Sequence, residues 1–342
     1  MFMLIDTEEQ LEDKLSRPSP DDITAMQSLQ GDILVLGVGG KMGPSLARLM
    51  RRAITEAGVQ KKIIAVARFT DQALPAALQA DGIETITADL LDDGALDRLP
   101  DVPNVIFMAA RKFGTTGAEH LSWAMNTQLP ALVASRYRNS RIVCFSSGNI
   151  YPLRPLHLGG ATEETPTDAR GEYAQSVLGR ERIFEYGSHR WGTPLTLLRL
   201  NYAVDLRYGV LSDIGTAVFQ RQPLDVRTPV LNAIWQRDAN SVCFRTFEYC
   251  QSPPFVLNLT GPETLSIRWI AEEFGKHFGW EPIFVGEETS SAYLSNAAKQ
   301  HQLFGYPTVT PNQMIAWTAH WIAGGKRNLN KPTHFQTRDG KY

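Results

Sequence analysis

The stretch from Asp32 to Arg52, DILVLGVGGKMGPSLARLMRR, constrains the fold of this chain more than any other part of its sequence. It opens with four apolar residues, Ile33 to Leu36, which are too few for a helix and predict a buried strand. After Gly43, apolar residues recur at the spacing of one helical face. A strand, a tight turn and a helix in this order predict the first unit of a parallel α/β sheet.

Glycines in this turn indicate a dinucleotide-binding site. In such a turn the first glycine permits the chain reversal, the second lets a pyrophosphate approach the backbone, and the third lets the helix pack closely on the strand. The unpaired N–H groups at the helix N-terminus also favour an anion. We prefer this interpretation to an ordinary strand–helix turn. The predicted cofactor-binding residues of the turn are Gly37, Gly39, Gly40, Lys41, Met42 and Gly43.

The charge of the chain excludes several classes of partner. Its formal net charge is −2, and acidic and basic residues are mixed along the sequence. No segment carries a concentrated positive charge that would bind nucleic acid or an anionic membrane, so we expect a small-molecule partner. The three cysteines lack metal-binding spacing and predict neither a metal site nor a disulfide framework. No apolar run reaches the about 18 residues of a membrane span, and the acidic N-terminal segment is unlike a signal peptide, so we expect a cytoplasmic protein.

Short apolar segments alternate with helical segments along the first two thirds of the chain. This alternation predicts an α/β fold, a doubly wound parallel sheet of the Rossmann type, with ligands bound outside the carboxyl ends of the strands. The later strands are predicted at Lys62–Ala67, Ile83–Thr87, Asn104–Ala109, Arg141–Ser146 and Pro194–Leu200.

The chain divides into four predicted regions. Residues 1–30 form a helical arm, and residues 31–200 form the dinucleotide-binding domain. Residues 201–323 form a smaller mixed α/β substrate domain, some of whose elements could return to the main sheet. Residues 324–342 are a polar, basic tail that we expect to be solvated or to contact another subunit.

Two strand ends bear on the choice of cofactor. The second strand ends at Ala67-Arg68, without the carboxylate that holds the ribose 2′-hydroxyl of NAD, whereas arginine could pair with a 2′-phosphate. We therefore expect NADP in preference to NAD. The third strand runs into Asp89-Leu90, where the carboxylate could accept from the adenine amino group and the leucine could cover the ring; capping of the next helix is the alternative role for Asp89.

The ends of the fourth and fifth strands carry the residues nearest the expected chemistry. Ala109 and Ala110 are small enough for a nicotinamide ribose to lie against the backbone. The next two residues, Arg111 and Lys112, could neutralise an anionic substrate or the cofactor pyrophosphate, or could simply be solvated. Ser146 to Tyr151 place a row of hydroxyl and amide groups at the mouth of the crevice.

At this point the sequence resembles the extended short-chain dehydrogenase/reductase family, the NAD(P)-dependent epimerases and dehydratases. The likeness runs from Gly31 to Ile322. It is carried by the glycine spacing, Asp89, Ala109-Ala110, Asn126, the Ser146-Ser147 pair followed by Ile150-Tyr151-Pro152, Tyr173, Asp238, Asn258 before Gly261, and Phe304-Gly305-Tyr306-Pro307.

The resemblance implies a role for each matching residue. Ser147 would orient the reacting hydroxyl or carbonyl, and Tyr173 would be the general acid/base. Lys112 would lie near the cofactor or the substrate, and Asn126, on the cofactor side, would hold the active-site helix. The residues expected to line the substrate pocket are Arg111, Asn149 and Tyr202.

One position departs from the family pattern. The family places a lysine four residues after its tyrosine, and this chain has Val177 there. Arg180 lies two helical turns from Tyr173, so we do not expect it to take the place of the lysine. Two possibilities remain: the nicotinamide and Lys112 lower the pKa of Tyr173 instead, or Tyr173 acts mainly as a proton donor while another group is the base. We prefer the first.

Two functions remain open from the sequence. The first is an NAD(P)-dependent epimerase, dehydratase or reductase that acts on a sugar, sugar acid or nucleotide sugar by hydride transfer. The second is a catalytically degenerate protein that binds NADP as a sensor or structural element. The family also implies a homodimer through the helices Gly117–Arg138 and Gly171–Gly187. Apolar residues off the main stripe of these helices, Trp123, Ile183 and Phe184, are the candidate contacts, and packing under the N-terminal arm is their alternative role.

Overall fold

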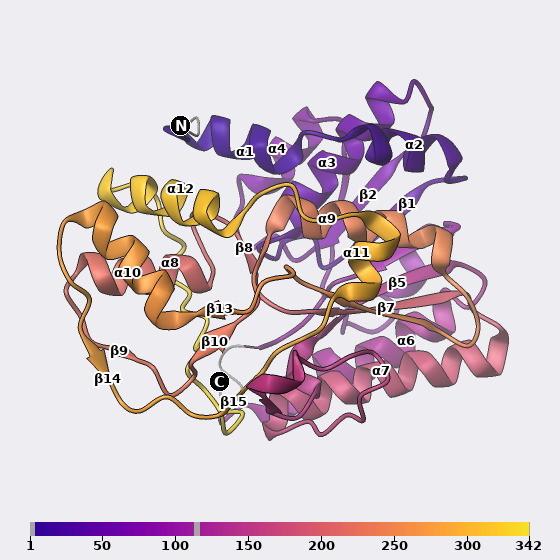
Figure 1. Cartoon of the computed structure of the whole chain (residues 1–342). Helices are drawn as coiled ribbons and strands as arrows, with labels where there is room; N and C mark the ends of the chain where they lie inside the picture. The colour runs from indigo at the N-terminus through magenta and orange to yellow at the C-terminus, as the bar shows by residue number, and fades with distance from the viewer. Residues whose placement is uncertain (1–3, 113–116, 342) are drawn as a thin grey trace.

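A computed structural model of the protein describes residues 4–112 and 117–341 (Figure 1). Its larger lobe is built on one parallel sheet with the strand order β12-β7-β5-β4-β1-β2-β3. The order reverses between β1 and β4, which confirms the predicted doubly wound fold and places the ligand crevice outside the carboxyl ends of the strands. The strands are β1 Ile33–Leu36, β2 Ile63–Ala67, β3 Glu84–Thr87, β4 Asn104–Phe107, β5 Arg141–Ser147, β7 Leu195–Leu200 and β12 Phe255–Leu259.

Helices cover both faces of this sheet (Figure 1). On β1, Ile33 and Val35 face one apolar core, and Leu34 and Leu36 face the other. Because successive side chains of a strand point to opposite faces, a strand buried on both sides is apolar throughout, as β1 is. The first core is covered by α3 Gly43–Glu56, α4 Leu74–Ala80 and α9 Gln236–Arg245, and the second by the 3-10 helix η1 Leu96–Arg98, α6 Leu129–Arg136 and α7 Gly171–Trp191.

The predicted helix over residues 117–138 is interrupted. The structure has α5 Glu119–Trp123, a π-helical segment η2 Ala124–Gln128, and then α6. Pro130 lacks an N–H group, and its ring clashes with the carbonyl four residues earlier, which belongs to Asn126. The wider π turn accommodates this clash, and the Asn126 side chain is fully buried within it.

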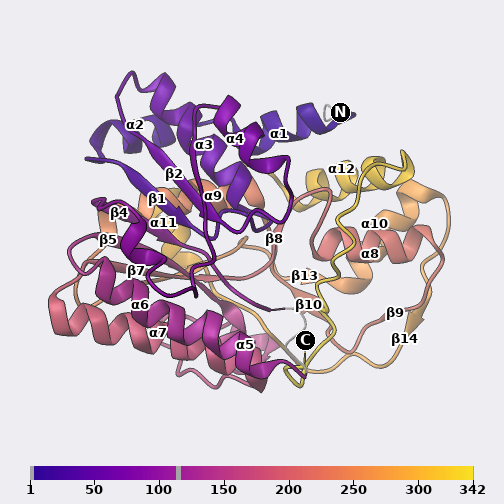
Figure 2. The same ribbon diagram turned by 180° about the vertical axis from the view of Figure 1, so that it is seen from behind.

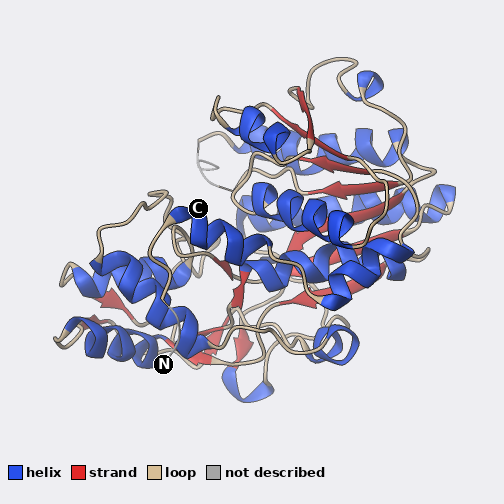
Figure 3. Ribbon diagram, turned by 90° about the horizontal axis from the view of Figure 1, so that it is seen from above, coloured by secondary structure: helices blue, strands red, loops and turns tan. Residues whose placement is uncertain are grey.

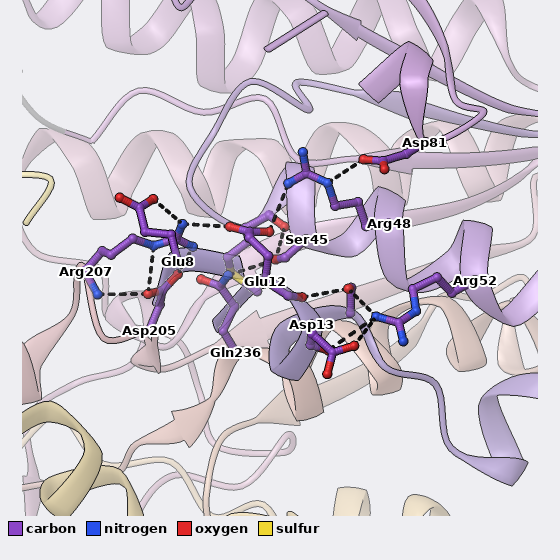
Figure 4. Close-up of polar contacts among 12 residues, drawn as sticks. Glu8, Glu12, Asp13, Ser45, Arg48, Arg52, Asp81, Asp205, Arg207 and Gln236 are labelled. Atoms are coloured by element: carbon purple, nitrogen blue, oxygen red, sulfur yellow. Dashed lines mark hydrogen bonds and ion pairs between the residues drawn. The ribbon is translucent and has the colours of Figure 1, made fainter. Parts of the chain in front are cut away.

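The N-terminal arm consists of α1 Glu8–Ser16 and α2 Pro20–Ser28. Leu11 and Leu15 of α1 are buried in the core of the second lobe, whereas Met26 of α2 is buried in the first core of the larger lobe. Figure 4 shows Glu12 of α1 between two arginines, Arg48 of α3 at 2.9 Å and Arg207 of the second lobe at 2.7 Å. The arm therefore ties the two lobes together.

The second lobe packs α8 Val210–Phe219, α10 Ile267–Phe278 and α12 Pro311–Ala323 around an apolar core that includes Trp235, Trp317 and Trp321. Residues 201–323 are shared between the lobes, because α9 lies on the main sheet and β12 forms its edge next to β7. Figure 3 shows the remaining strands as short separate pieces. These short strands are β6 Arg154–Pro155, β8 Ala203–Val204, β9 Leu224–Asp225, β10 Val230–Leu231, β11 Ile234–Trp235, β13 Leu265–Ser266, β14 Phe284–Val285 and β15 Ser291–Ala292. The remaining helices are α11 Ala298–Phe304 and the 3-10 helices η3 Gly148–Ile150, η4 Leu156–Leu158 and η5 Thr246–Tyr249.

The tail after α12 is not a solvated extension. It returns along the second lobe toward the larger one, as Figure 2 shows. Thr333 and Phe335 are only 2% and 3% exposed. Among the residues described, no helix is long and apolar enough to cross a membrane, and no cluster of three or more histidine, cysteine or carboxylate side chains could hold a metal ion.

Candidate functional site

The turn between β1 and α3 has the shape that a pyrophosphate requires. Gly37 has φ +94°, and a Cβ there would lie 2.5 Å from the Ala109 nitrogen. A Cβ at Gly43 would lie 2.1 Å from the Val38 carbonyl oxygen, so only glycine allows the helix to approach the strand. At Gly40 the nearest atom would be the Gly37 oxygen, 3.6 Å away, which leaves the backbone open to a phosphate. The residues present therefore fit a dinucleotide at the α3 N-terminus.

The residues predicted to select the cofactor contact each other. Arg68 NH1 lies 3.6 Å from Asp89 Oδ2, so the arginine charge already has a carboxylate beside it. Asp89 Oδ1 also accepts from the Leu91 N–H at 3.1 Å, a local turn contact. It is not the helix cap that the sequence left open, because the next helix, η1, begins at Leu96 after Ala95. Leu90 is buried against Ile64 in the second core rather than standing free to cover an adenine ring.

Asn126 fastens the end of the fourth strand to α7. Its Oδ1 accepts from the Arg111 N–H at 3.1 Å, and its Nδ2 donates to the Arg111 carbonyl at 3.0 Å. The same Nδ2 donates to Ser176 Oγ at 2.9 Å, and Oδ1 accepts from Arg180 at 2.6 Å. Since Asn126 has no exposed surface, it acts through the residues it holds.

Tyr173 and Ser147 meet at the carboxyl end of β5. The tyrosine is 9% exposed, and its hydroxyl is hydrogen-bonded to the Ser147 side chain. Ser147 Oγ also accepts from the Asn149 N–H at 3.1 Å. The structure thus brings the predicted serine and tyrosine together, in an arrangement in which the two hydroxyls could hold a single substrate oxygen.

Burial raises the pKa of Tyr173, while the charge of Arg180 and the hydrogen bond from Ser147 oppose the rise. The phenol therefore carries its proton at neutral pH. Lys112 does lie beside it, with Nζ 5.6 Å from the centre of the Tyr173 ring. Burial also lowers the pKa of Lys112, to about 8.

The position of the expected lysine is part of a small apolar cluster. Val177 is fully buried with Ile150 and Tyr173. The nearby cation is Arg180, whose guanidinium donates to the Phe145 carbonyl at 2.8 Å. From its spacing in the sequence, Arg180 is expected to lie too far along the helix to take the place of the lysine. Long side chains on a helix, however, point back toward the helix N-terminus. Its charge therefore acts on the pKa of Tyr173 from two turns away.

Sequence reasoning missed a buried polar network behind the site. Glu181 accepts from Ser146 Oγ at 2.5 Å and from both Nε and NH2 of Arg199, at 3.0 and 2.8 Å. Arg199 also donates to the Tyr151 hydroxyl at 2.7 Å, which donates to Asn258 Oδ1 at 2.8 Å. The network fixes the end of β5 that carries Ser147. Its signal in the sequence was an arginine inside the otherwise apolar strand β7.

The second lobe faces the glycine-rich turn through Tyr208 and Asp213. The Lys41 Nζ lies 3.1 Å from the centre of the Tyr208 ring. Burial lowers the pKa of Lys41 to about 7, and the charges of Lys331 and Lys112 act in the same direction, while Asp213 opposes them. Three lysines thus share this part of the crevice with one carboxylate.

The predicted pocket residue Tyr202 has φ +44° and follows β7. Burial raises its pKa well above the usual value, and the charge of Asp213 adds to the effect. Arg111 is held by its backbone at the end of the fourth strand, and Ala109 is buried there. Arg111, Ala109 and Tyr202 thus lie just beyond the carboxyl ends of β4 and β7.

Comparison with solved structures shows the same fold. The UDP-glucuronic acid 4-epimerase of Bacillus cereus, in complex with NAD, superposes with a TM-score of 0.70 at 16% identity, over 86% of this chain and 98% of that chain. The UDP-glucose 4-epimerase of Thermotoga maritima, with UDP-glucose, gives 0.69 at 14% identity over 86% and 99%. The UDP-glucose 4-epimerase of Thermus thermophilus, in complex with NAD, gives 0.68 at 17% identity over 86% and 99%.

No curated protein sequence matches the chain significantly. The sequence profile of the NAD dependent epimerase/dehydratase family, however, matches residues 33–204, which is half of the chain. The protein therefore belongs to the NAD dependent epimerase/dehydratase family.

Proposed function

We propose that the protein is an NAD-dependent epimerase, dehydratase or reductase that acts on a sugar or sugar acid. The observation that carries this proposal is the hydrogen-bonded pair of Ser147 and Tyr173, set beside a turn whose glycines fit a dinucleotide. A bound nicotinamide dinucleotide supplies a hydride acceptor and donor. The protein would hold the cofactor with the glycine-rich turn and the fourth strand end.

Side chains of the protein would transfer the proton to and from the reacting oxygen of the substrate. Ser147 Oγ and the Tyr173 hydroxyl would hold the reacting substrate oxygen, and the protonated Tyr173 would donate to that oxygen when it is a carbonyl. When the phenol gives up its proton, the charge of Arg180 would stabilise the resulting anion. Arg180 would in this way supply the electrostatic support that the resemblance assigns to a lysine.

We infer that NAD is the working cofactor, which corrects the NADP preference drawn from Ala67-Arg68. Two of the structural neighbours are NAD complexes. Asp89 lies 3.6 Å from Arg68, so a 2′-phosphate brought to this arginine would also meet a carboxylate. Titration of the protein with each cofactor should give at least tenfold tighter binding of NAD, and tighter binding of NADP would reverse the assignment.

The charges in the crevice favour an acidic substrate. Lys41, Lys112 and Lys331 outnumber Asp213 among the groups whose charges act there, and the cofactor pyrophosphate together with an acidic substrate would compensate the excess positive charge. UDP-glucuronic acid 4-epimerase, an enzyme named for an acidic sugar nucleotide, has the same fold. A sugar acid is therefore our preferred substrate class.

The alternative is a degenerate protein that binds the dinucleotide without chemistry, and Val177 is the observation that favours it. The two functions separate in one experiment. The NAD-loaded protein is incubated with a panel of sugars and sugar acids, and three readouts are measured: reduced nicotinamide, exchange of solvent label into the sugar, and conversion of the sugar to an epimer or a dehydrated product. Turnover with any member by any readout supports the enzyme, whereas tight NAD binding with none of the three across the panel supports the alternative.

We also propose a homodimer through the α5–α6 and α7 faces. Trp123 is 36% exposed and suits such a contact, as does the partly exposed Ile183. Phe184 does not, because it is buried edge-on against Phe107, with ring centres 5.3 Å apart. Light scattering should give twice the 38.1 kDa chain mass, and the monomer mass at micromolar concentration would contradict the proposal.

A further inference from the structure

The segment Asn328–Gly340, which we name the C-terminal strap, is attached along α8. The Asn328 side chain donates to Ser212 Oγ at 3.1 Å, and the Leu329 N–H donates to the Arg207 carbonyl at 2.9 Å. Both the N–H and the hydroxyl of Thr333 donate to Asp213 Oδ2, at 2.7 and 2.6 Å. The first half of the strap is thus fixed to the helix that faces the glycine-rich turn.

The second half of the strap reaches the larger lobe. Arg338 donates to the carbonyl and the hydroxyl of Ser291, at 2.7 and 2.8 Å. Gly340 then packs against the start of α7 so closely that a Cβ at Gly171 would lie 2.3 Å from the Gly340 oxygen. Gly171 precedes Tyr173 by two residues. In Figure 2 the strap runs from the second lobe to this end of α7.

The strap connects α8 with the start of α7, the two helices that carry Asp213 and Tyr173. Lys331 on the strap is close enough for its charge to act on Lys41 of the glycine-rich turn. A substrate that extended from Tyr173 to α8 would have to share this part of the molecule with the strap, whereas a compact substrate would not.

The comparisons indicate that this chain has segments beyond the shared fold. The Bacillus cereus UDP-glucuronic acid 4-epimerase is matched over 98% of its length by 86% of this chain, so about a seventh of this chain has no counterpart there. The enzymes named above act on sugars that carry a UDP group, and each must leave room for it.

We propose that the C-terminal strap is a specificity element that closes the substrate side of the crevice and restricts the site to a compact substrate without a nucleotide group. This inference rests on the proposed function, since it narrows the sugar substrates of the same site. The strap excludes the nucleotide by occupying its path, so loosening the strap admits it.

The test compares binding of UDP-glucuronic acid and free D-glucuronic acid to the NAD-loaded full chain by calorimetry. Two variants loosen the strap: Arg338→Ala alone, and Arg338→Ala combined with Thr333→Val. The matched control is Gln336→Ala, whose exposed side chain lies on the strap and whose carbonyl, which accepts from Thr228, is unchanged. Circular dichroism and the melting temperature confirm that each variant is folded. If the double variant is not folded, the test uses Arg338→Ala alone.

We expect the unmodified protein to bind UDP-glucuronic acid at least tenfold more weakly than D-glucuronic acid. Loosening the strap should raise the affinity for UDP-glucuronic acid at least tenfold and change that for D-glucuronic acid less than threefold, while Gln336→Ala changes neither. Equal affinities in the unmodified protein, or no gain in a folded loosened variant, would overturn the strap inference and leave the proposed function standing. If no form of the protein binds either compound, the proposed sugar substrate fails together with the inference.

Discussion

The two ends of the crevice are built in different ways. At the cofactor end, a Cβ at position 37 or 43 would clash with backbone atoms, so glycine is required at both. The strand behind them and the buried face of α3 are apolar. At the proton-transfer end, the position expected to carry a cation is the buried Val177, and the charges lie deeper, on Arg180 and Glu181. The comparison teaches that the backbone shape of a phosphate-binding turn restricts positions 37 and 43 to glycine. Electrostatic support for a tyrosine can come from more than one place.

The largest effect should come from breaking the buried network at the proton-transfer end. Glu181→Gln leaves the Arg199 guanidinium buried without its carboxylate, and such a loss costs about 3–5 kcal/mol of the free energy of unfolding. The surface pair of Arg182 and Glu185 on the same helix is the control, and Arg182→Gln should stay within about 0.5 kcal/mol. Denaturant titration measures both. A small loss for Glu181→Gln would mean that the network does not hold the end of β5.

The next largest effect is expected on turnover when the Tyr173 hydroxyl is removed, since an enzyme needs this group and a protein that only binds the dinucleotide does not. Tyr173→Phe should lower turnover by roughly 100-fold, the scale of general acid/base catalysis, and leave NAD affinity nearly unchanged. Tyr186→Phe is the matched control, since Tyr186 is an exposed tyrosine on the same helix. Steady-state rates on the substrate found by the panel and calorimetry with NAD give the two readouts. Full activity of Tyr173→Phe would place the proton donor elsewhere in the crevice.

A smaller effect is expected from pH. Lysines bind an anion in their charged form, and the pKa values of Lys41 and Lys112 are lowered to about 7 and about 8. The affinity for an acidic substrate should therefore fall roughly tenfold as pH rises from about 6 to about 9. Lys41→Gln should weaken binding at the low end of this range and flatten the profile. Affinity that rises with pH would show that these lysines do not face the substrate.

The smallest effect is expected at the outer edge of the cofactor end. Arg68 is exposed and already paired with Asp89, and exposed pairs contribute little. Arg68→Ala should change the dissociation constant of NAD by less than about threefold. A much larger loss for NADP than for NAD in the same variant would instead show that Arg68 contacts a 2′-phosphate.

The sequence predicted the structure best where local features determine it, namely glycines that a turn requires and apolar residues that form one buried face. The strand, turn and helix around Gly37 and the alternation of elements followed from local patterns, and the family profile supports them. The sequence left open a return of elements after residue 200 to the main sheet, but it could not identify β12 as the one that pairs with β7, because a short apolar strand carries no mark of its neighbour. The position of Arg180 and the network around Arg199 depend on side-chain direction and long-range pairing, which spacing alone does not give.

The order of elements along the chain has a consequence for folding during synthesis. The N-terminal arm is made early, yet its buried Asp22 pairs with Arg237 and its Glu12 with Arg207, residues made roughly two hundred positions later. The edge strand β12 likewise arrives more than fifty residues after β7, which it must join. Contacts so distant in sequence slow folding, because the loop between them must close before they stabilise anything. The segment that matches the family profile, residues 33–204, therefore lacks its edge strand and two of the ion-pair partners of the arm, Arg207 and Arg237, when it leaves the ribosome. We expect the complete fold to form only once most of the chain has been made.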